Sequence, residues 1–246
     1  MTNFRSRTRR WLFAAAACAL LIPAGCNRPA SEAAAGEAPA SQPSAVRAES
    51  PGNAILRNAA EPFEALTEQA FAAPWPEADR LIADGGSAAA RARGILPDPA
   101  ADMLDARLAA IAAARQAQDR PGLALAAVET YRHLVQAQDG ATAQVPIPIS
   151  LLDYAGFRYD ALAQAPNVDW AAMDQAARFA GDQWRAIQPS IASPSLRGVM
   201  PQSIGAMSAA VRQRDVPFAR SAAATELALV DLLEEHAAAQ QRGAGR

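Results

Sequence analysis

The segment PNVDWAAMDQAARFAGDQWRAI, residues 166–187, shows the plan on which the whole chain is built. It opens with a break that contains Pro and Asp, and an apolar stripe follows in which residues recur every three or four positions. The stripe consists of Trp170, Met173, Ala177, Ala180, Trp184 and Ile187. This spacing places the side chains on one face of an α-helix. The segment therefore predicts a turn followed by an amphipathic helix.

Three more segments beyond Glu61 follow the same plan. Their breaks contain Pro74, Pro121 and Pro217, and successive breaks lie about 45 to 48 residues apart. Asp or Asn in a break can cap the next helix, and Pro is tolerated in a first helical turn. No sustained alternation of apolar and polar residues indicates strands. We predict an all-α fold with about eight helices in four antiparallel hairpins forming a bundle, the alternative being a short helical-repeat solenoid.

Two of these hairpins also resemble each other in sequence. Residues 113–121 read AARQAQDRP, and residues 210–217 read AVRQRDVP. In both, an Arg-Gln pair precedes an Asp and a Pro, and a pair of Ala residues follows a few positions later. The resemblance suggests an old duplication.

Residues 1–26 have the composition of an export signal. Four Arg occur among the first ten residues, an apolar run extends from Trp11 to Ile22, and small residues precede Cys26. The run is too short for a permanent membrane span. This leader resembles a bacterial lipoprotein signal peptide. The resemblance implies that residues 1–25 are removed and that Cys26 becomes the lipid-modified N-terminus.

The leader departs from the lipoprotein pattern at one position. Pro23 stands three residues before the cysteine, where that family has a branched aliphatic residue. The alternative is cleavage by the ordinary signal peptidase near Ala24 or Gly25, which would release a soluble periplasmic protein. In the lipoprotein family an Asp after the cysteine retains proteins at the inner membrane. Asn27 stands there instead, so the resemblance implies an outer-membrane anchor.

The remaining chain divides by composition. Residues 26–60 are rich in Pro, Ala, Ser and Glu and have few aliphatic side chains, which predicts a lipid-anchored disordered linker. Residues 61–240 form the predicted helical domain, and residues 241–246 form a disordered tail.

Composition excludes several functional classes. All 23 basic residues are Arg, so no Lys is present for a Schiff base or a Walker-type phosphate site. Cys18 lies in the leader and Cys26 is the lipid site, which leaves no thiol for catalysis or a disulfide. Removing the four Arg of the leader changes the formal charge from -2 to -6, which argues against a nucleic-acid partner. We predict no cofactor and no enzymatic activity.

A ligand site is predicted where aromatic and charged residues are densest, in DYAGFRYD at residues 153–160. Tyr154 and Arg158 are four residues apart on a helix, so a phenol and a guanidinium share a face that suits a carboxylate or a sugar hydroxyl. Asp153 and Tyr159 complete the predicted site. The alternative interpretation is that Tyr159 belongs to the core, Arg158 pairs with a carboxylate and Asp153 caps the helix.

His133 and His236 are the only histidines, and they support an alternative function in metal or haem handling. Tyr131 and Met207 are the auxiliary ligands in that hypothesis. No HExxH, paired ExxH or CxxCH motif accompanies them. The simpler interpretation is a partly buried His133 and a solvated His236 near the end of a helix.

Taken together, these patterns predict a membrane-tethered periplasmic lipoprotein whose helical body binds an envelope protein or a small ligand. An enzymatic function based on Asp153, Tyr154 and Arg158 is not supported by any catalytic sequence motif.

Overall fold

The computed structural model describes residues 48–244, and within them the chain is helical, without strands. The elements are α1 (Pro51–Gln69), α2 (Trp75–Arg93), α3 (Asp98–Gln116), α4 (Arg120–Gln136), α5 (Ile147–Ala163), α6 (Trp170–Ile187), the short 3-10 helix η1 (Gln188–Ser190), α7 (Pro194–Gln213) and α8 (Val216–Ala244). This confirms the predicted all-α class with eight α-helices. The predicted leader and Cys26 lie outside the described residues. No helix between residues 48 and 244 has both the length and the apolar character needed to cross a bilayer.

All four predicted breaks fall between helices, and their capping residues act locally. Side-chain oxygens of Asp119, Asp169 and Asp215 accept hydrogen bonds from backbone amides three residues later, at 2.9–3.0 Å. Each bond satisfies one of the free N–H groups of a helix N-terminus. Pro stands in the first turn of most of these helices, where its missing N–H has no consequence.

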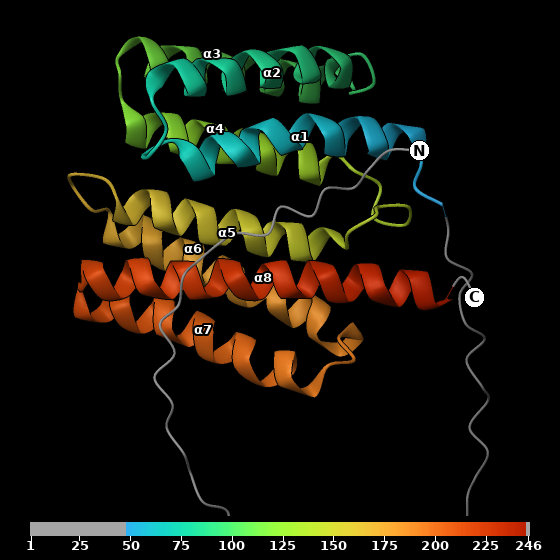
Figure 1. Cartoon of the computed structure of the whole chain (residues 1–246), viewed down its shortest axis with the longest axis vertical. Helices are drawn as coiled ribbons and strands as arrows, with labels where there is room; N and C mark the ends of the chain where they lie inside the picture. The colour runs from blue at the N-terminus through green and yellow to red at the C-terminus, as the bar shows by residue number, and fades with distance from the viewer. Residues whose placement is uncertain (1–47, 245–246) are drawn as a thin grey trace, which may run out of the picture. The chain divides into compact units, whose positions relative to one another are not determined.

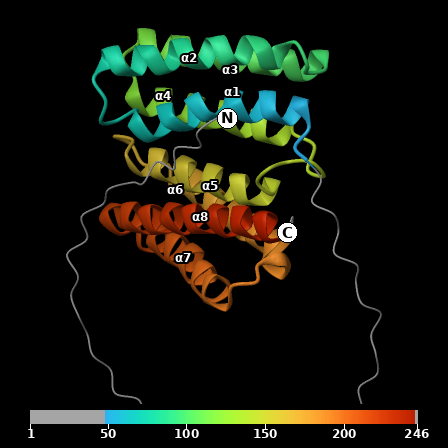
Figure 2. The same ribbon diagram turned by 45° about the vertical axis from the view of Figure 1, so that its right-hand side comes forward.

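The helices form two four-helix bundles. In the first, α1 packs on α2 and α4, and α3 packs on α4 and, less extensively, on α2. In the second, α5 packs on α6 and α8, while α7 packs on α6 and α8. Figures 1 and 2 show the resulting layers, in which the α1/α4 pair lies next to the α5/α6 pair. In each half the fourth helix packs against the first, α4 on α1 and α8 on α5, which closes a four-helix bundle. The predicted bundle is therefore confirmed, and the alternative of a solenoid, in which hairpins only stack in sequence, is wrong.

The second bundle repeats the first. Each helix of α5–α8 begins 95 or 96 residues after its counterpart in α1–α4. Buried residues recur at the same spacing, in the pairs Leu56/Leu152, Phe63/Tyr159, Leu104/Met200 and Ile111/Met207. The repeating unit is therefore two hairpins long.

The turns between the third and fourth helix of each bundle are also equivalent. Gln118 and Arg214 are the only non-glycine residues in the described range with positive φ, at 54° and 52°. After each, the amide of the following Asp donates to the carbonyl of the residue five positions earlier, Ala114 or Ala210. This is a left-handed C-cap that satisfies free helix carbonyls. The resemblance between residues 113–121 and 210–217 thus has a structural counterpart.

Two predicted boundaries are wrong. The first helix begins at Pro51, ten residues before the predicted start of the helical domain, and α8 continues to Ala244 into the predicted tail. The early start has a tertiary cause. Asn53 is 2% exposed and exchanges two hydrogen bonds of 2.8 Å with the backbone of Asp139 in the loop between α4 and α5. This pairing joins segments that lie 86 residues apart, so the local composition did not indicate it.

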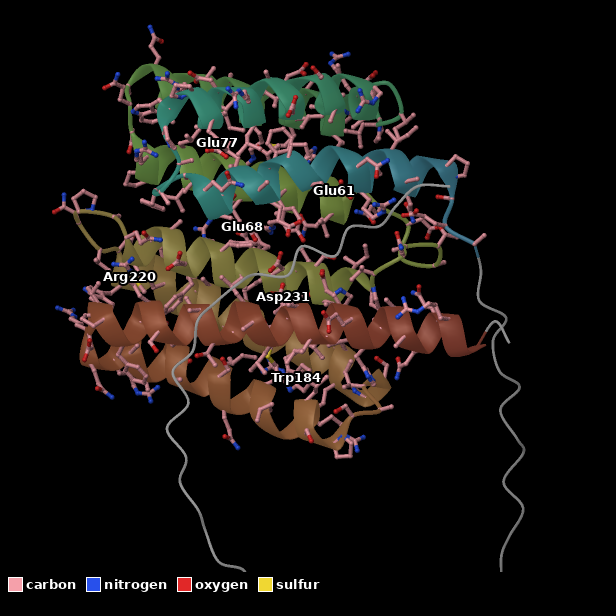
Figure 3. The ribbon with its side chains drawn as sticks, viewed as in Figure 1. Glu61, Glu68, Glu77, Trp184, Arg220 and Asp231 are labelled. Carbon is pink, nitrogen blue, oxygen red and sulfur yellow. The ribbon has the colours of Figure 1, made fainter. Side chains whose placement is uncertain are left out.

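The core of the second bundle contains three buried polar side chains, Trp184, Ser203 and Glu226, that have no hydrogen-bond partner among the described residues. Trp184 is 3% exposed between α6, α7 and α8, and its indole nitrogen makes no hydrogen bond in the described part of the chain (Figure 3). Glu226 on α8 is fully buried, and neither of its carboxyl oxygens has a hydrogen-bond partner there. Gly156 of α5 makes room for it, because a Cβ at that position would lie 2.0 Å from Oε2 of Glu226.

Burial raises the pKa of Glu226 well above its usual range, and the nearby Asp231 raises it further. The counterpart of Glu226 in the first bundle is Thr130, which is equally buried but donates its hydroxyl proton to the carbonyl of Ala126 at 2.8 Å. The second bundle therefore holds an ionisable group where the first holds a satisfied neutral one.

We expect Glu226→Gln to stabilise the protein at neutral and alkaline pH. Because the folded-state pKa of Glu226 is raised, its favourable contribution is complete below the unfolded pKa and is lost as pH rises toward the folded pKa. Urea unfolding should show that the free energy of unfolding falls less between about pH 5 and about pH 8 in the variant than in the wild type. At the higher pH the variant should be more stable than the wild type by on the order of 1–3 kcal/mol. Glu235→Gln, an exposed change on the same helix, is the control. Equal pH dependence in all three proteins would contradict the assignment.

Candidate functional site

A small pocket opens where the two bundles meet. Its cavity volume is about 180 Å³. The lining residues are Arg132 of α4, Tyr154 and Arg158 of α5, and Gln175, Ala176 and Phe179 of α6. Two guanidinium groups, a phenol and a carboxamide thus surround a space large enough for a small molecule. The pocket depends on the packing of α4 against α5, because its side chains come from both bundles.

Glu129 of α4 organises the polar side of this pocket. Its Oε1 accepts hydrogen bonds from the Tyr154 hydroxyl at 2.8 Å and from Nη1 of Arg158. Its Oε2 lies 3.6 Å from Nη2 of Arg107 and 3.7 Å from Nη1 of Arg132. The Glu129 side chain is 12% exposed, so this carboxylate pairs with cations at a partly desolvated position. One carboxylate thereby holds side chains of α3, α4 and α5 together.

Within the described residues, the three guanidinium groups that pair with Glu129 exceed this one carboxylate by two charges. Arg107, Arg132 and Arg158 share the single negative charge of Glu129. The Nε atoms of Arg107 and Arg132 are buried, and neither has a hydrogen-bond partner in the part of the chain that is described. Guanidinium groups with free donors are the usual ligands of carboxylate and phosphate oxygens. The cluster can therefore accept a further anion.

Aromatic rings form the other side of the pocket. Tyr154 and Phe179 meet edge to face, with ring centroids 5.5 Å apart at 85°. The guanidinium carbon of Arg132 lies 5.1 Å from the centroid of Tyr154 and 5.5 Å from that of Phe179. These distances are within the range of cation–π interactions, which hold Arg132 over the rings. Arg132 is thereby positioned before any ligand arrives.

Burial raises the pKa of the Tyr154 phenol, and the negative charge of Glu129 raises it further, whereas Arg158 and Arg132 act in the opposite direction. The phenol is consequently neutral at physiological pH. It donates its proton to Glu129 and presents its oxygen lone pairs to Arg132 and Arg158, each 3.4 Å away. The phenol is thus part of the hydrogen-bonded network and not a free nucleophile.

The structure brings two of the four predicted ligand-binding residues to this pocket. Tyr154 and Arg158 lie side by side as the helical spacing predicted. Asp153 is 4% exposed and faces carboxylates of α1 and α8; burial, and then Glu64 and Glu234, raise its pKa well above the usual range. Tyr159 is fully buried and donates to the carbonyl of Met207 at 2.8 Å. These two residues belong to the core, because neighbouring positions on a helix point about 100° apart.

The two histidines occupy different bundles. Nε2 of His133 on α4 lies 2.7 Å from the carbonyl oxygen of Ala100 on α3, whereas Nε2 of His236 on α8 lies 3.0 Å from Gln240 of its own helix. Helix α4 packs on α1, α3 and α5, and α8 packs on α5 and α7. Between residues 48 and 244 no three His, Cys, Asp or Glu side chains are grouped as metal ligands. Each histidine therefore contacts a group of its own bundle, Ala100 for His133 and Gln240 for His236.

Sequence reasoning missed most of the residues that complete the pocket. Arg132 and Glu129 are three residues apart on α4, a spacing that places them on one helical face. Their relation to Tyr154 follows from the contact between α4 and α5, and that of Phe179 from the contact between α5 and α6. No local pattern in the sequence encodes these contacts.

Comparison with protein-family models, curated proteins and solved structures found no match to this chain.

Neutralising Glu129 should lower the pKa of Tyr154. In Glu129→Gln the phenolate no longer faces a negative charge, while the guanidinium groups of Arg132 and Arg158 still favour it. Titration of the ultraviolet absorbance of tyrosinate would follow the change, and Tyr154→Phe would identify the transition that belongs to this residue. Glu77→Gln, an exposed substitution on α2, should leave the titration as it is. An unchanged Tyr154 transition in Glu129→Gln would show that the carboxylate does not act on the phenol.

Proposed function

We propose that this protein is a membrane-tethered helical lipoprotein of the periplasm, without enzymatic activity, whose pocket between the two bundles captures a small anionic ligand. The observation that carries the proposal is the convergence of Arg107, Arg132 and Arg158 on one carboxylate beside an accessible pocket. An anion in the pocket balances the two excess charges and accepts hydrogen bonds from the guanidinium groups of Arg132 and Arg158.

The size of the pocket limits the ligand. Sites for drug-sized molecules have volumes of roughly 300–1,000 Å³, and this one is about 180 Å³. An inorganic oxyanion or a short carboxylic acid suits this space. The rings of Tyr154 and Phe179 provide an apolar wall for a short hydrocarbon chain, and Gln175 provides a neutral hydrogen-bonding group at the rim.

The membrane tether in this proposal comes from the leader. Its resemblance to lipoprotein signal peptides supports lipid attachment at Cys26 and localisation at the outer membrane, with soluble periplasmic export as the alternative. The helical body then binds either the small ligand or an envelope protein, and the acidic mature chain does not favour nucleic acid.

Titration calorimetry of the mature protein with phosphate, sulfate and succinate tests the binding proposal. We expect at least one of these anions to bind, and Arg158→Gln or Arg132→Gln to weaken its binding by about tenfold or more, since a charge-assisted hydrogen bond contributes about 1.5–3 kcal/mol. Arg185→Gln removes an exposed guanidinium elsewhere on α6 and should have no effect. Absence of binding by all three anions, or equal affinities in all variants, would refute the proposal.

A second experiment tests the tether. The wild-type protein, expressed with its own leader in a Gram-negative host, should appear in the membrane fraction, and Cys26→Ser should remove it from that fraction. Mass spectrometry of the mature wild-type protein should find a lipid on Cys26. Release of unmodified wild-type protein into the soluble periplasm would establish ordinary signal-peptidase cleavage instead.

A further inference from the structure

The second bundle has an open groove at the place where two arginines lie over a tryptophan in the first bundle. The groove lies between the start of α6 and the end of α7 and has a volume of about 710 Å³. It is lined by Trp170, Ala171, Asp174, Arg178, Ser208, Val211, Arg212 and Arg214. It shares no residue with the pocket between the bundles. Its volume is in the range of sites for organic ligands.

In the first bundle two arginines fill the equivalent position. The guanidinium carbons of Arg115 and Arg120 lie 4.4 and 4.3 Å from the centroid of the Trp75 ring. Nη2 of Arg115 also donates to Oδ2 of Asp79 at 2.9 Å. Arg115 and Arg120 thus lie over the Trp75 ring, and Arg115 also pairs with Asp79.

The second bundle keeps the tryptophan and the aspartate but lacks these two cations. Trp170 and Asp174 stand at the start of α6 as Trp75 and Asp79 stand at the start of α2. The residues 96 positions after Arg115 and Arg120 are Val211 and Val216. Asp174 pairs instead with Arg178 of its own helix at 2.6 Å, and within residues 48–244 no guanidinium lies over the Trp170 ring.

The arginines near Trp170 occupy different positions from the arginines near Trp75. Three arginines line the groove at positions whose first-bundle counterparts are uncharged, in the pairs Arg178/Ala83, Arg212/Gln116 and Arg214/Gln118. Asp174 balances one of these charges. The groove therefore combines an apolar base, made by Trp170 and Val211, with two excess positive charges at its rim.

We infer that this groove binds an organic anion that carries a planar unsaturated ring. The ring takes the place that Arg115 and Arg120 occupy over Trp75, and the anionic group pairs with Arg212 and Arg214. A flat π-system stacks on an indole in any rotation about the ring normal, and the guanidinium groups then fix the orientation. A guanidinium ligand, which would imitate Arg115, is disfavoured because the rim is already cationic.

Calorimetry and quenching of Trp fluorescence with naphthalene carboxylate test this inference. Naphthalene methanol supplies the ring without the charge, acetate supplies the charge without the ring, and free arginine supplies the competing cation. We expect naphthalene carboxylate to bind at least about tenfold more tightly than any of the three.

Val211→Arg is the decisive variant, because it restores in the second bundle the residue that lies over the tryptophan ring in the first. The first bundle shows that this fold accommodates Arg at the position, paired with the aspartate and stacked on the tryptophan. We expect Val211→Arg to abolish binding and the double variant Arg212→Gln, Arg214→Gln to weaken it by about tenfold or more. Arg197→Gln, an exposed change on α7 outside the groove, is the matched control and should have no effect.

Arg158→Gln separates this groove from the pocket between the bundles. It should leave binding of naphthalene carboxylate unchanged, whatever it does to binding of small anions. The inference is overturned if the wild-type protein does not bind naphthalene carboxylate, if Val211→Arg binds as the wild type does, if Arg158→Gln abolishes binding, or if arginine binds more tightly than the aromatic anion.

Discussion

The carboxylate of Glu129 is the constraint on which the interface between the bundles depends. A charge placed at 12% exposure is unfavourable unless it is paired, and here the pairing comes from α3, α4 and α5 at once. The same pairing leaves the three guanidinium groups short of negative charge. A group that holds the bundles together therefore also creates a local excess of cations beside the pocket, so the proposed ligand recognition would use the same side chains as the packing. A bound anion would supply the negative charge that Glu129 alone does not provide to these arginines.

The repeat explains why residues 48–244 contain this charged cluster on α4 and not on α8. In α4 the interface face carries Glu129 and Arg132, whereas the counterparts of these residues in α8 are Thr225 and Ala228, both exposed. Helix α8 thus has the backbone position of α4 without the charged pair that attaches a further bundle. Core positions kept their apolar character in both halves because packing demands it, as Leu56 and Leu152 show. Surface positions differ between the halves, and the groove at Trp170 lies at one such difference.

The sequence predicted the elements well because their signals are local. Apolar spacing, an Asp that caps the next helix and a Pro in the first turn are all read within a few residues, and each of the four predicted breaks separates two helices. The packing of the hairpins into two bundles was harder to predict from the sequence, because it depends on which hairpins contact each other. The candidate site shows the same division. The pairing of Tyr154 with Arg158 follows from helical spacing, but Arg132 and Phe179 join them only through contacts between helices. The early start of α1 was missed for the same reason, because Asn53 is held by Asp139, which lies far along the chain.

Net charge is a poor guide to the ligands of this protein. The full chain has a formal net charge of -2 at pH 7, yet both cavities are lined by more Arg than carboxylate. Part of the acidic charge is withdrawn from solvent in the second bundle, where burial favours the neutral forms of Asp153 and Glu226. What a ligand meets is the local field at a cavity, which depends on a few groups within a Debye length and not on the sum over the chain. Because every cation here is a guanidinium, with five donors in a fixed plane, each cavity offers directional contacts to an oxyanion that an ammonium group would not. The acidic composition and the two anion-binding proposals are therefore compatible.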